Sequence, residues 1–210
     1  RESGKRGITA FIVDMKLPGV SLGKEEQKLG LVGCATSDVF LEDVRVHKDD
    51  ILGRVGEGFT DAMKCLDVGR IGVAAQSLGI AQGAYDRMID YMMEREQFGV
   101  TLSRFDTLRF EVARIRMQLE SARLLVYRAA DNKDKGLPYT AEAAMAKLAA
   151  SEAAVDITRK SIQFHGGYGY MADRPIERMY RDAKITEIYE GTSQVQQMVI
   201  AADTFAPKKK

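Results

Sequence analysis

The sequence contains few of the residues that build metal clusters and disulfide frameworks. Its 210 residues include two cysteines, two histidines and no tryptophan. Cys34 and Cys65 are too few for a disulfide framework, and they favour a reducing compartment. Together with His47 and His165 they are also too few for a metal cluster, so we predict no metal site.

Charge of one sign and long hydrophobic runs are lacking as well. The chain has 31 Lys and Arg residues against 30 Asp and Glu residues, a formal net charge of +1. Such a balance produces no strong field that attracts nucleic acid or a membrane surface, and no apolar run reaches the length of a membrane span. We therefore expect neither partner, and we expect the three lysines at 208–210 to form a solvated, disordered tail.

The first part of the chain has the pattern of β structure. Short β-branched and aromatic runs at 8–13, 36–41 and 44–46 predict strands. These strands are too few to close a sheet. We therefore expect the rest of a β domain to lie upstream. Because the first residue is Arg1 and not Met, we also expect the true N-terminus of the protein to lie further upstream.

After Gly58 the hydrophobic pattern changes to that of helices. Apolar residues recur at intervals of three and four, which predicts long packed helices over 74–92, 108–129 and 141–162. Two shorter helices are expected at about 176–188 and 194–205. Short loops between long helices favour antiparallel neighbours.

These patterns predict a mainly α fragment of the α+β class. Residues 1–50 are expected to be the C-terminal part of a β domain, and residues 51–210 an antiparallel up-down helical bundle domain. Several helical stripes consist of small residues, which fill less volume, so we expect a partner subunit to pack on the bundle.

Three common kinds of active site find no support in the sequence. A di-iron bundle needs Glu-x-x-His pairs, and neither histidine follows a glutamate by three residues. The G-x-S-x-G sequence at 19–23 follows a turn and leads into no predicted helix, so it lacks the strand-turn-helix context of a nucleophile elbow. The glycines of 166–169 follow a predicted helix and not a strand, so they lack the context of a dinucleotide fingerprint.

Four breaks in the helical pattern could carry chemistry, and each has a structural alternative. Glu190 precedes a helix that we expect to begin at Ser193, where Gln196 has capping-box spacing; it could also merely complement the helix dipole. Residues 163–170 could hold a flat or phosphorylated ligand, or form a helix C-cap with a hydrophobic anchor. Arg95 could bind phosphate or favour a helix C-terminus, and residues 67–70 could form an i,i+3 ion pair.

The order and spacing of these clusters resembles the acyl-CoA dehydrogenase family, of the short- or medium-chain or butyryl-CoA type. The motifs that carry the resemblance are LDVGR at 66–70, REQFG at 95–99, QFHGGYG at 163–169, RDAK at 181–184 and YEGTSQ at 189–194. Upstream, KLG at 28–30 and FLEDVRV at 40–46 resemble the second half of that family's middle β domain. The resemblance covers essentially the whole chain and implies that it corresponds to the C-terminal half of a family member.

The resemblance implies an FAD-dependent oxidoreductase of fatty acid β-oxidation. Glu190 would remove the α-proton of an acyl-CoA thioester while the β-hydride passes to FAD, giving the trans-2-enoyl-CoA. The substrate-binding residues it implies are Asp67, Arg70, Tyr189 and Gly191. The cofactor-binding residues it implies are Arg95, Phe98, Gln163, Phe164, His165, Gly166, Gly167, Thr192, Ser193 and Gln194. Arg95 and Phe98 would reach the FAD of a neighbouring subunit.

Two further positions bear on the resemblance. Some relatives place the base just before the arginine of the 66–70 motif; here that position is Gly69, which favours Glu190 as the base and a straight-chain substrate. Position 106 often carries Gln in relatives, but Asp106 with Ser103 has capping-box spacing here, so we leave it out of the site.

The resemblance also implies partners and leaves alternatives open. Electrons would pass to an electron-transfer flavoprotein, and the protein would form a homo-oligomer, either a dimer or a homotetramer. The same site could work in reverse as an enoyl-CoA reductase, or the chain could be a non-catalytic fragment that only assembles with partners. Bacterial cytoplasm is the preferred location, with the mitochondrial matrix as the alternative.

Overall fold

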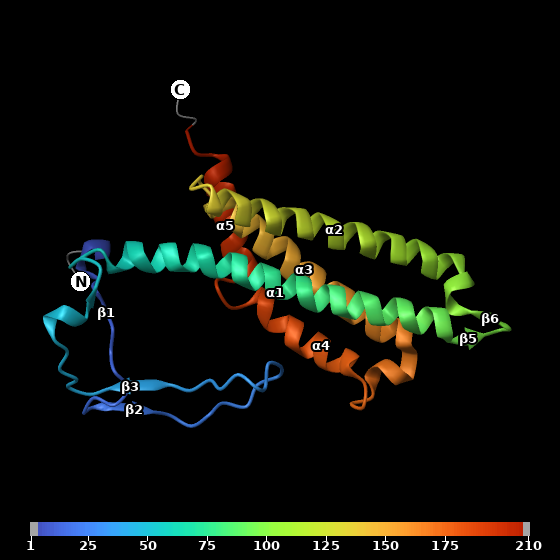
Figure 1. Cartoon of the computed structure of the whole chain (residues 1–210), viewed down its shortest axis with the longest axis horizontal. Coiled ribbons are helices and arrows are strands. Elements are labelled where there is room, and N and C mark those ends of the chain that lie inside the picture. Colours follow the sequence, from blue (N-terminus) through green and yellow to red (C-terminus); the bar gives the residue numbers. More distant parts are fainter. Residues whose placement is uncertain (1–3, 208–210) are drawn as a thin grey trace. The chain divides into compact units, whose positions relative to one another are not determined.

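The computed structural model describes residues 4–207, so the tail predicted at 208–210 lies outside the described residues. The chain divides into two compact units, of which the first ends at Leu66 and the second begins at Asp67. Figure 1 labels all five α-helices and five of the six strands of residues 4–207. The boundary predicted at residue 50 rests on a change of sequence pattern from β to helical. This division into a β domain and a bundle domain stays a prediction.

The first unit contains two antiparallel strand pairs. Strand β1 (Ala10–Phe11) pairs with β4 (Ile51–Leu52), and β2 (Val20–Leu22) pairs with β3 (Val39–Leu41). Two of the predicted strands thus appear in shortened form as β1 and β3. Isolated strand pairs of this size have little stability of their own, and apolar side chains on them, such as Leu22 and Leu41, are exposed.

The strand predicted at 44–46 is wrong. Asp43 adopts a positive φ of 50°, which breaks the extended path after β3. The chain then leads into the 3₁₀ turn η2 (Lys48–Asp50), whose capping box pairs the side chains and backbone N–H groups of His47 and Asp50. Local turn chemistry therefore overrides the β propensity of Val44 and Val46.

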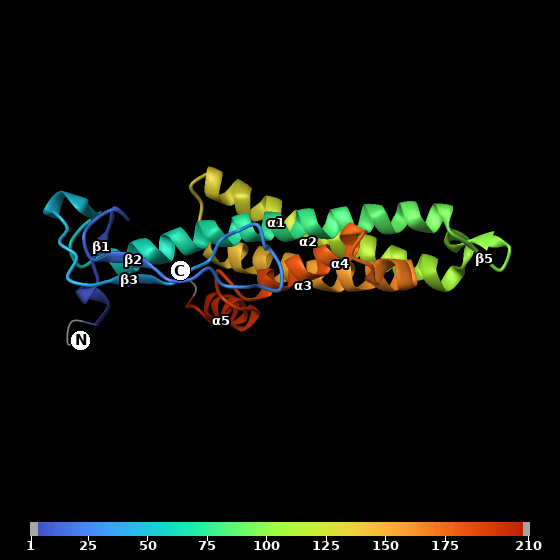
Figure 2. The same cartoon turned by 90° about the horizontal axis from the view of Figure 1, so that it is seen from below.

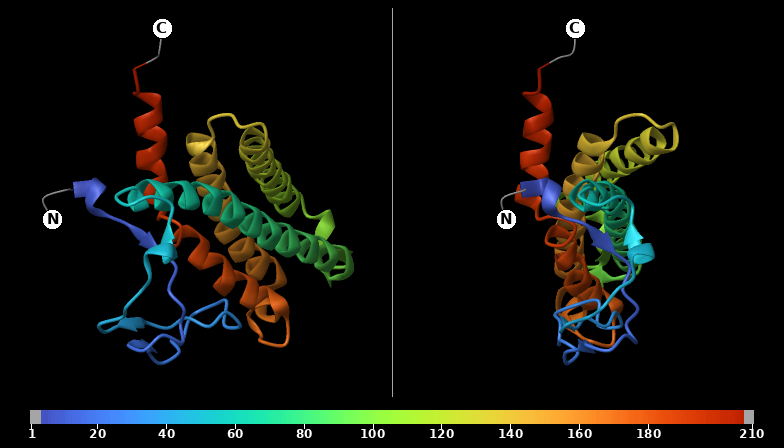
Figure 3. Two further views of the ribbon diagram at one scale, coloured as in Figure 1. Left: turned by 60° about the vertical axis from the view of Figure 1, so that its left-hand side comes forward. Right: turned by 90° about the vertical axis from the view of Figure 1, so that its left-hand side faces the viewer.

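The second part of the chain is a helical bundle, as predicted. Helices α1 (Gly58–Glu94), α2 (Asp106–Asp134) and α3 (Thr140–His165) alternate in direction and lie side by side (Figures 1 and 2). The chain continues through η4 (Gly166–Tyr170), α4 (Pro175–Lys184), η5 (Ile185–Glu187) and α5 (Ser193–Thr204). Figure 3 shows α5 beside α3, with its C-terminal end pointing out of the bundle. In residues 4–207, no helix combines the length and hydrophobicity needed to cross a bilayer.

Small side chains let the three long helices approach closely. The core contains many alanines of α1 and α3, among them Ala84 and Ala150. At one point the Ser161 hydroxyl of α3 donates a hydrogen bond of 3.1 Å to the Ala84 carbonyl of α1. Such contact between a side chain and a neighbouring helix backbone requires that no bulky residue intervene. The small-residue stripes seen in the sequence are therefore used, at least in part, within the chain.

Some helix boundaries and one helix cap differ from the predictions. Helix α1 begins at Gly58, 16 residues before the predicted stripe that starts at residue 74. The helix expected to reach residue 188 ends at Lys184 and continues as the 3₁₀ turn η5. The capping box predicted between Ser103 and Asp106 is wrong, because the N-cap of α2 is Phe105 and makes no side-chain cap. Ser103 instead hydrogen-bonds to the Thr101 hydroxyl at 2.8 Å.

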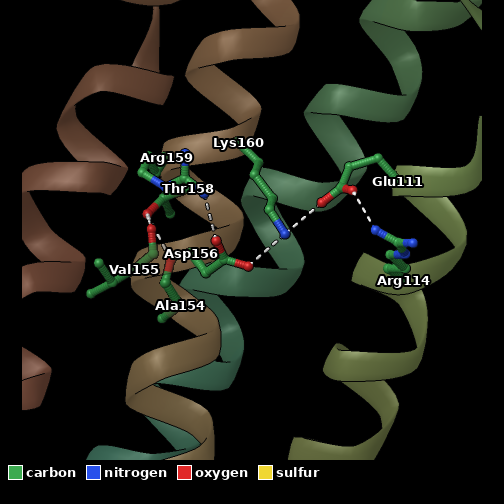
Figure 4. A network of polar contacts seen from close by, with 8 residues as sticks. All are labelled: Glu111, Arg114, Ala154, Val155, Asp156, Thr158, Arg159 and Lys160. Atoms are coloured by element: carbon green, nitrogen blue, oxygen red, sulfur yellow. Dashed lines mark hydrogen bonds and ion pairs between the residues drawn. The ribbon is translucent and has the colours of Figure 1, made fainter. Parts of the chain in front are cut away.

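An ion-pair network joins α2 to α3 (Figure 4). The Lys160 ammonium lies 2.5 Å from a carboxylate oxygen of Glu111 and 2.7 Å from one of Asp156. Burial alone would lower the pKa of Lys160, but its hydrogen bonds to Asp156 and Glu111 outweigh this and raise that pKa above its usual 10.5. Burial would raise the pKa of Asp156, but hydrogen bonds from Lys160 and Arg159 hold it below its usual 3.8.

Replacing Lys160 with Met in the full-length protein is expected to lower the free energy of unfolding by about 1–3 kcal/mol, since two partly buried carboxylates lose their cation. Because the folded-state pKa of Asp156 is lowered, its contribution is fully present above pH 3.8 and is lost as the pH falls through its folded value. Urea denaturation at several pH values measures both effects. Equal stability of variant and wild type near neutral pH would show that the network contributes nothing.

Candidate functional site

The turn between η5 and α5 has an unusual backbone conformation. Glu190 has a φ of 54° and Gly191 a φ of 94°, so both residues lie in the left-handed region. For Glu190 this conformation costs about 1–2 kcal/mol. Such a cost persists only where the surroundings fix the backbone, and it occurs often at functional sites.

Two fully buried side chains hold the carbonyl groups of this turn. The Gln196 side-chain amide of α5 donates to the Glu190 carbonyl at 3.1 Å and to the Gly191 carbonyl at 2.8 Å. The Lys147 ammonium of α3 donates to the same Gly191 carbonyl at 2.7 Å. In residues 4–207, no hydrogen bond engages the backbone N–H of Glu190 or of Gly191.

The N-terminus of α5 is capped differently from the prediction. The helix begins at Ser193 as expected, but Thr192 is the N-cap and its hydroxyl accepts from the Val195 N–H. The predicted capping box between Ser193 and Gln196 is therefore wrong. The side-chain nitrogen of Gln196 donates to the carbonyls of the preceding turn, and its Oε1 atom has no partner among the described residues.

The carboxylate of Glu190 lies against α1 at Gly69. A Cβ atom placed on Gly69 would stand 2.9 Å from the carboxyl carbon of Glu190 and closer still to one of its oxygens. A glycine is therefore required at this position of α1 for the carboxylate to lie where it does.

The predicted residues Asp67 and Arg70 lie close to Gly69 in the sequence of α1. Their i,i+3 ion pair has a distance of 2.8 Å, and the Thr140 hydroxyl of α3 donates to the second oxygen of Asp67 at 2.7 Å. The ion-pair alternative is thus present in the structure. The Nε atom of Arg70 is nevertheless buried without a partner in the described residues, so this guanidinium keeps a free donor.

Tyr189 reaches α1 from the other side of the turn. Its hydroxyl hydrogen-bonds to the side-chain carbonyl of Gln76. The structure therefore brings together five predicted residues at one place. They are Asp67, Arg70, Tyr189, Glu190 and Gly191.

Lys147 is the titratable group most affected by this environment. Its pKa is lowered to about 8, mainly because the side chain is buried. The nearby Arg70 guanidinium also lowers this pKa, whereas the carboxylates of Glu187 and Glu190 raise it. The sequence shows this lysine only as one residue of a predicted helix rich in alanine, which does not indicate its contact with residue 191. Gln76 and Thr140 were also missed, because their contacts with Tyr189 and Asp67 join residues far apart in the sequence.

A second group of predicted residues lines a pocket of about 540 Å³ at the far end of α3. Arg95 directly follows α1, and Gly166 and Gly167 belong to η4, where a Cβ atom would meet nothing within 4 Å at either glycine. The guanidinium groups of Arg95 and Arg174 lie 5.8 and 5.2 Å from the ring centre of Tyr168. The predicted residues in the lining are Arg95, Gln163, Phe164, His165, Gly166 and Gly167.

His165 is part of the pocket wall. Its Nδ1 atom lies 2.7 Å from the Ser161 carbonyl and must donate to it, since a carbonyl oxygen only accepts. Its ring stacks on Tyr91 at 4.4 Å between centroids. The pKa of His165 is lowered, mainly because the ring is buried and also because the positive charge of Arg174 is near. The hydrogen bond to Ser161 raises this pKa but does not offset the decrease. The imidazole is therefore held in one orientation and favours the neutral form.

Phe98 lies on a hairpin next to this pocket. Strands β5 (Glu96–Gln97) and β6 (Val100–Thr101) enclose a two-residue turn in which Phe98 and Gly99 have φ values of 55° and 83°. Positive φ at both positions matches a type I′ turn, which normally avoids large residues. Phe98 is 95% exposed, so its ring is presented outward at a conformational cost.

The remaining predicted residues, Thr192, Ser193 and Gln194, lie at the start of α5 and not at the pocket. Lys147, which contacts the neighbouring Gly191, precedes the pocket residue Gln163 by 16 positions in α3, or about 24 Å along the helix. Figure 1 shows the corresponding separation between the start of α5 and η4. The predicted cofactor residues therefore fall into two groups within one chain.

Residues 4–207 contain no group of three His, Cys, Asp or Glu side chains arranged to hold a metal ion.

Comparison with known proteins reveals extensive similarity. The family profile described as "Acyl-CoA dehydrogenase, C-terminal domain" matches residues 56–205. The chain is 56% identical to "Caffeyl-CoA reductase-Etf complex subunit CarC" of Acetobacterium woodii, over 94% of this chain and 52% of that protein. It is 54% identical to the mitochondrial short-chain specific acyl-CoA dehydrogenase of Homo sapiens, over 93% of this chain and 48% of that protein.

The fold has equally similar solved counterparts. The butyryl-CoA dehydrogenase of Megasphaera elsdenii matches with a TM-score of 0.95 and 46% identity, over 97% of this chain and 53% of that chain. The chain thus spans about half the length of the relatives it matches. The chain belongs to the acyl-CoA dehydrogenase family, whose C-terminal helical domain it contains.

Proposed function

We propose that the protein containing this chain is an FAD-dependent acyl-CoA dehydrogenase acting on short- or medium-chain acyl-CoA thioesters. The observation that carries the proposal is the Glu190 carboxylate, held against Gly69 by a turn of unfavourable backbone conformation. Glu190 is the general base that takes the α-proton. FAD, when bound, accepts the hydride from the β-carbon, so that the α–β single bond becomes a double bond.

The backbone around Glu190 suits a thioester substrate. Removal of the α-proton places negative charge on the thioester oxygen, and preorganised N–H donors stabilise such charge. The N–H groups of Glu190 and Gly191 have no acceptor among the described residues, while Gln196 and Lys147 fix the two carbonyls beside them. Arg70 and Asp67 lie close to Gly69 on α1 and are proposed to contact the substrate near its thioester, with Tyr189 and Gly191 completing the substrate site.

The two separate groups of predicted cofactor residues support FAD binding between two copies of the chain. In one copy, Thr192, Ser193 and Gln194 offer a helix N-terminus to phosphate or ribose groups. In the other copy, Arg95, Phe98 and the pocket at residues 163–167 receive the adenosine end. An oligomer is also favoured by a row of exposed apolar side chains along α2, formed by Phe110, Met117, Leu124 and Tyr127.

The absorption spectrum of the full-length protein tests this proposal. The purified protein should be yellow, and anaerobic addition of butyryl-CoA should bleach the flavin band while enoyl-CoA forms. Sedimentation should give a dimer or tetramer. A colourless protein that takes up no FAD would instead support a non-catalytic module that only assembles with partners.

One relative favours the reverse reaction, in which an enoyl-CoA is reduced to the acyl-CoA. The caffeyl-CoA reductase subunit is named as part of an Etf complex, so we propose an electron-transfer flavoprotein as the partner in either direction. The flavin reduction potential, measured with and without bound acyl-CoA, distinguishes an electron donor to that partner from an enoyl-CoA reductase. The related proteins include bacterial and mitochondrial ones, and the bacterial cytoplasm stays our preferred location.

A further inference from the structure

Lys147 occupies a position where a lysine is costly. It is fully buried in the first third of α3, on a face whose neighbours include Ala143, Ala144 and Ser151. Removing an ammonium group from water carries a large penalty unless it finds compensating partners. In residues 4–207 no carboxylate lies within ion-pairing distance of its nitrogen, and its hydrogen bond goes to the carbonyl of Gly191.

The contact fixes a peptide group next to the proposed base. In a planar trans peptide the carbonyl and the N–H point in opposite directions. Because Lys147 holds the Gly191 carbonyl on the α3 side, the N–H of Thr192 points to the other side, at the start of α5. Gln196 orients the preceding peptide in the same way through the Glu190 carbonyl.

Three charged groups face the Lys147 ammonium. Glu187 comes from η5, Glu190 from the turn and Arg70 from α1. The two carboxylates favour the charged amine, whereas burial and Arg70 oppose it, which leaves its pKa at about 8. The ammonium group is therefore available at neutral pH and becomes a neutral amine in mildly alkaline solution.

We propose that Lys147 is a positioning residue of the active site, whose ammonium group holds the Gly191 carbonyl so that the Glu190 carboxylate keeps its place against Gly69. This inference rests on the proposed role of Glu190. Lys147 touches neither substrate nor cofactor in this scheme; it acts through the turn. A neutral amine donates a weaker hydrogen bond than an ammonium group, so turnover should fall as the pH rises through about 8.

Two substitutions in the full-length, FAD-loaded protein test the proposal. Lys147→Met removes the donor at similar side-chain length, and kcat should fall on the order of 10- to 100-fold with little change in KM. Lys147→Arg keeps a cation that does not deprotonate, so activity should be partly rescued and the decline of kcat above about pH 8 should disappear. Flavin absorbance and thermal melting confirm that each variant remains folded.

Lys160→Met is the matched control, because it removes a second cation, only partly buried, from α3 outside the site. It should lower stability without altering kcat or its pH profile. Wild-type kcat and an unchanged pH profile in Lys147→Met would overturn the inference. If Lys147→Met does not fold, the arginine variant decides: an alkaline decline identical to that of the wild type rules out the proposed role.

The outcome is separable from that of the proposed function. Glu190→Gln is measured in parallel under the same conditions. An inactive Glu190→Gln with a fully active Lys147→Met removes only the role of Lys147. A fully active Glu190→Gln removes the proposed base, whatever the lysine variants do.

Discussion

Replacing Glu190 with Gln is expected to leave the full-length protein folded and loaded with FAD while lowering turnover on the order of 10²- to 10⁴-fold. Glutamine has nearly the same size, but its amide cannot take a proton. The turn itself should persist, because Lys147 and Gln196 hold its backbone carbonyls and not the Glu190 carboxylate. The loss should therefore appear in kcat with the flavin spectrum unchanged.

The measurement is the steady-state rate with a short-chain acyl-CoA and an electron acceptor. Glu177→Gln is a suitable control, since it removes a carboxylate that pairs with Arg181 on α4, away from the Glu190 turn. That variant should turn over at nearly the wild-type rate. Normal turnover in Glu190→Gln would remove Glu190 from the mechanism.

Replacing Gly69 with Ala is expected to lower turnover on the order of 10²-fold without loss of stability. The new methyl group would stand 2.9 Å from the carboxyl carbon of Glu190, which is closer than unbonded carbon atoms approach. Because the carboxylate ends a flexible side chain, it should move aside and leave the fold intact. Alanine also favours a helix over glycine by about 0.5–1 kcal/mol, so the melting temperature should stay equal or rise.

Gly79→Ala provides the control for this effect. It lies on the same helix, is exposed, and a Cβ atom there meets nothing within 4 Å. It should stabilise α1 to a similar degree and leave kcat unchanged. If Gly69→Ala retains wild-type turnover, the carboxylate does not work from its position against Gly69.

The sequence was sufficient to predict the helical part of the fold. Apolar spacing of three and four persists over long segments, and the resulting helices α1, α2 and α3 match the predicted stripes. The β region was harder to predict. Its strands have two or three residues each, which is too short for alternation to be recognised, and a local turn after Asp43 replaced one predicted strand.

The candidate site shows the same contrast between local and distant information. Motif order indicated Glu190 and Gly191, and the structure places them with Asp67, Arg70 and Tyr189 as one group. Lys147 acts across 44 positions of sequence, and a single sequence carries no sign of such a contact. Gln196 illustrates a different limit: its spacing from Ser193 fits a capping box, but burial directs its amide to the turn instead.

The central claim is that the carboxylate of Glu190 takes the α-proton of a thioester bound beside α1. Exchange of α-hydrogen with deuterated solvent tests it most directly, because NMR of the acyl-CoA reports the event without any electron acceptor. The FAD-loaded wild type should exchange the α-hydrogen of butyryl-CoA, and Glu190→Gln should show almost none. Exchange at the wild-type rate in Glu190→Gln would mean that another group removes the proton.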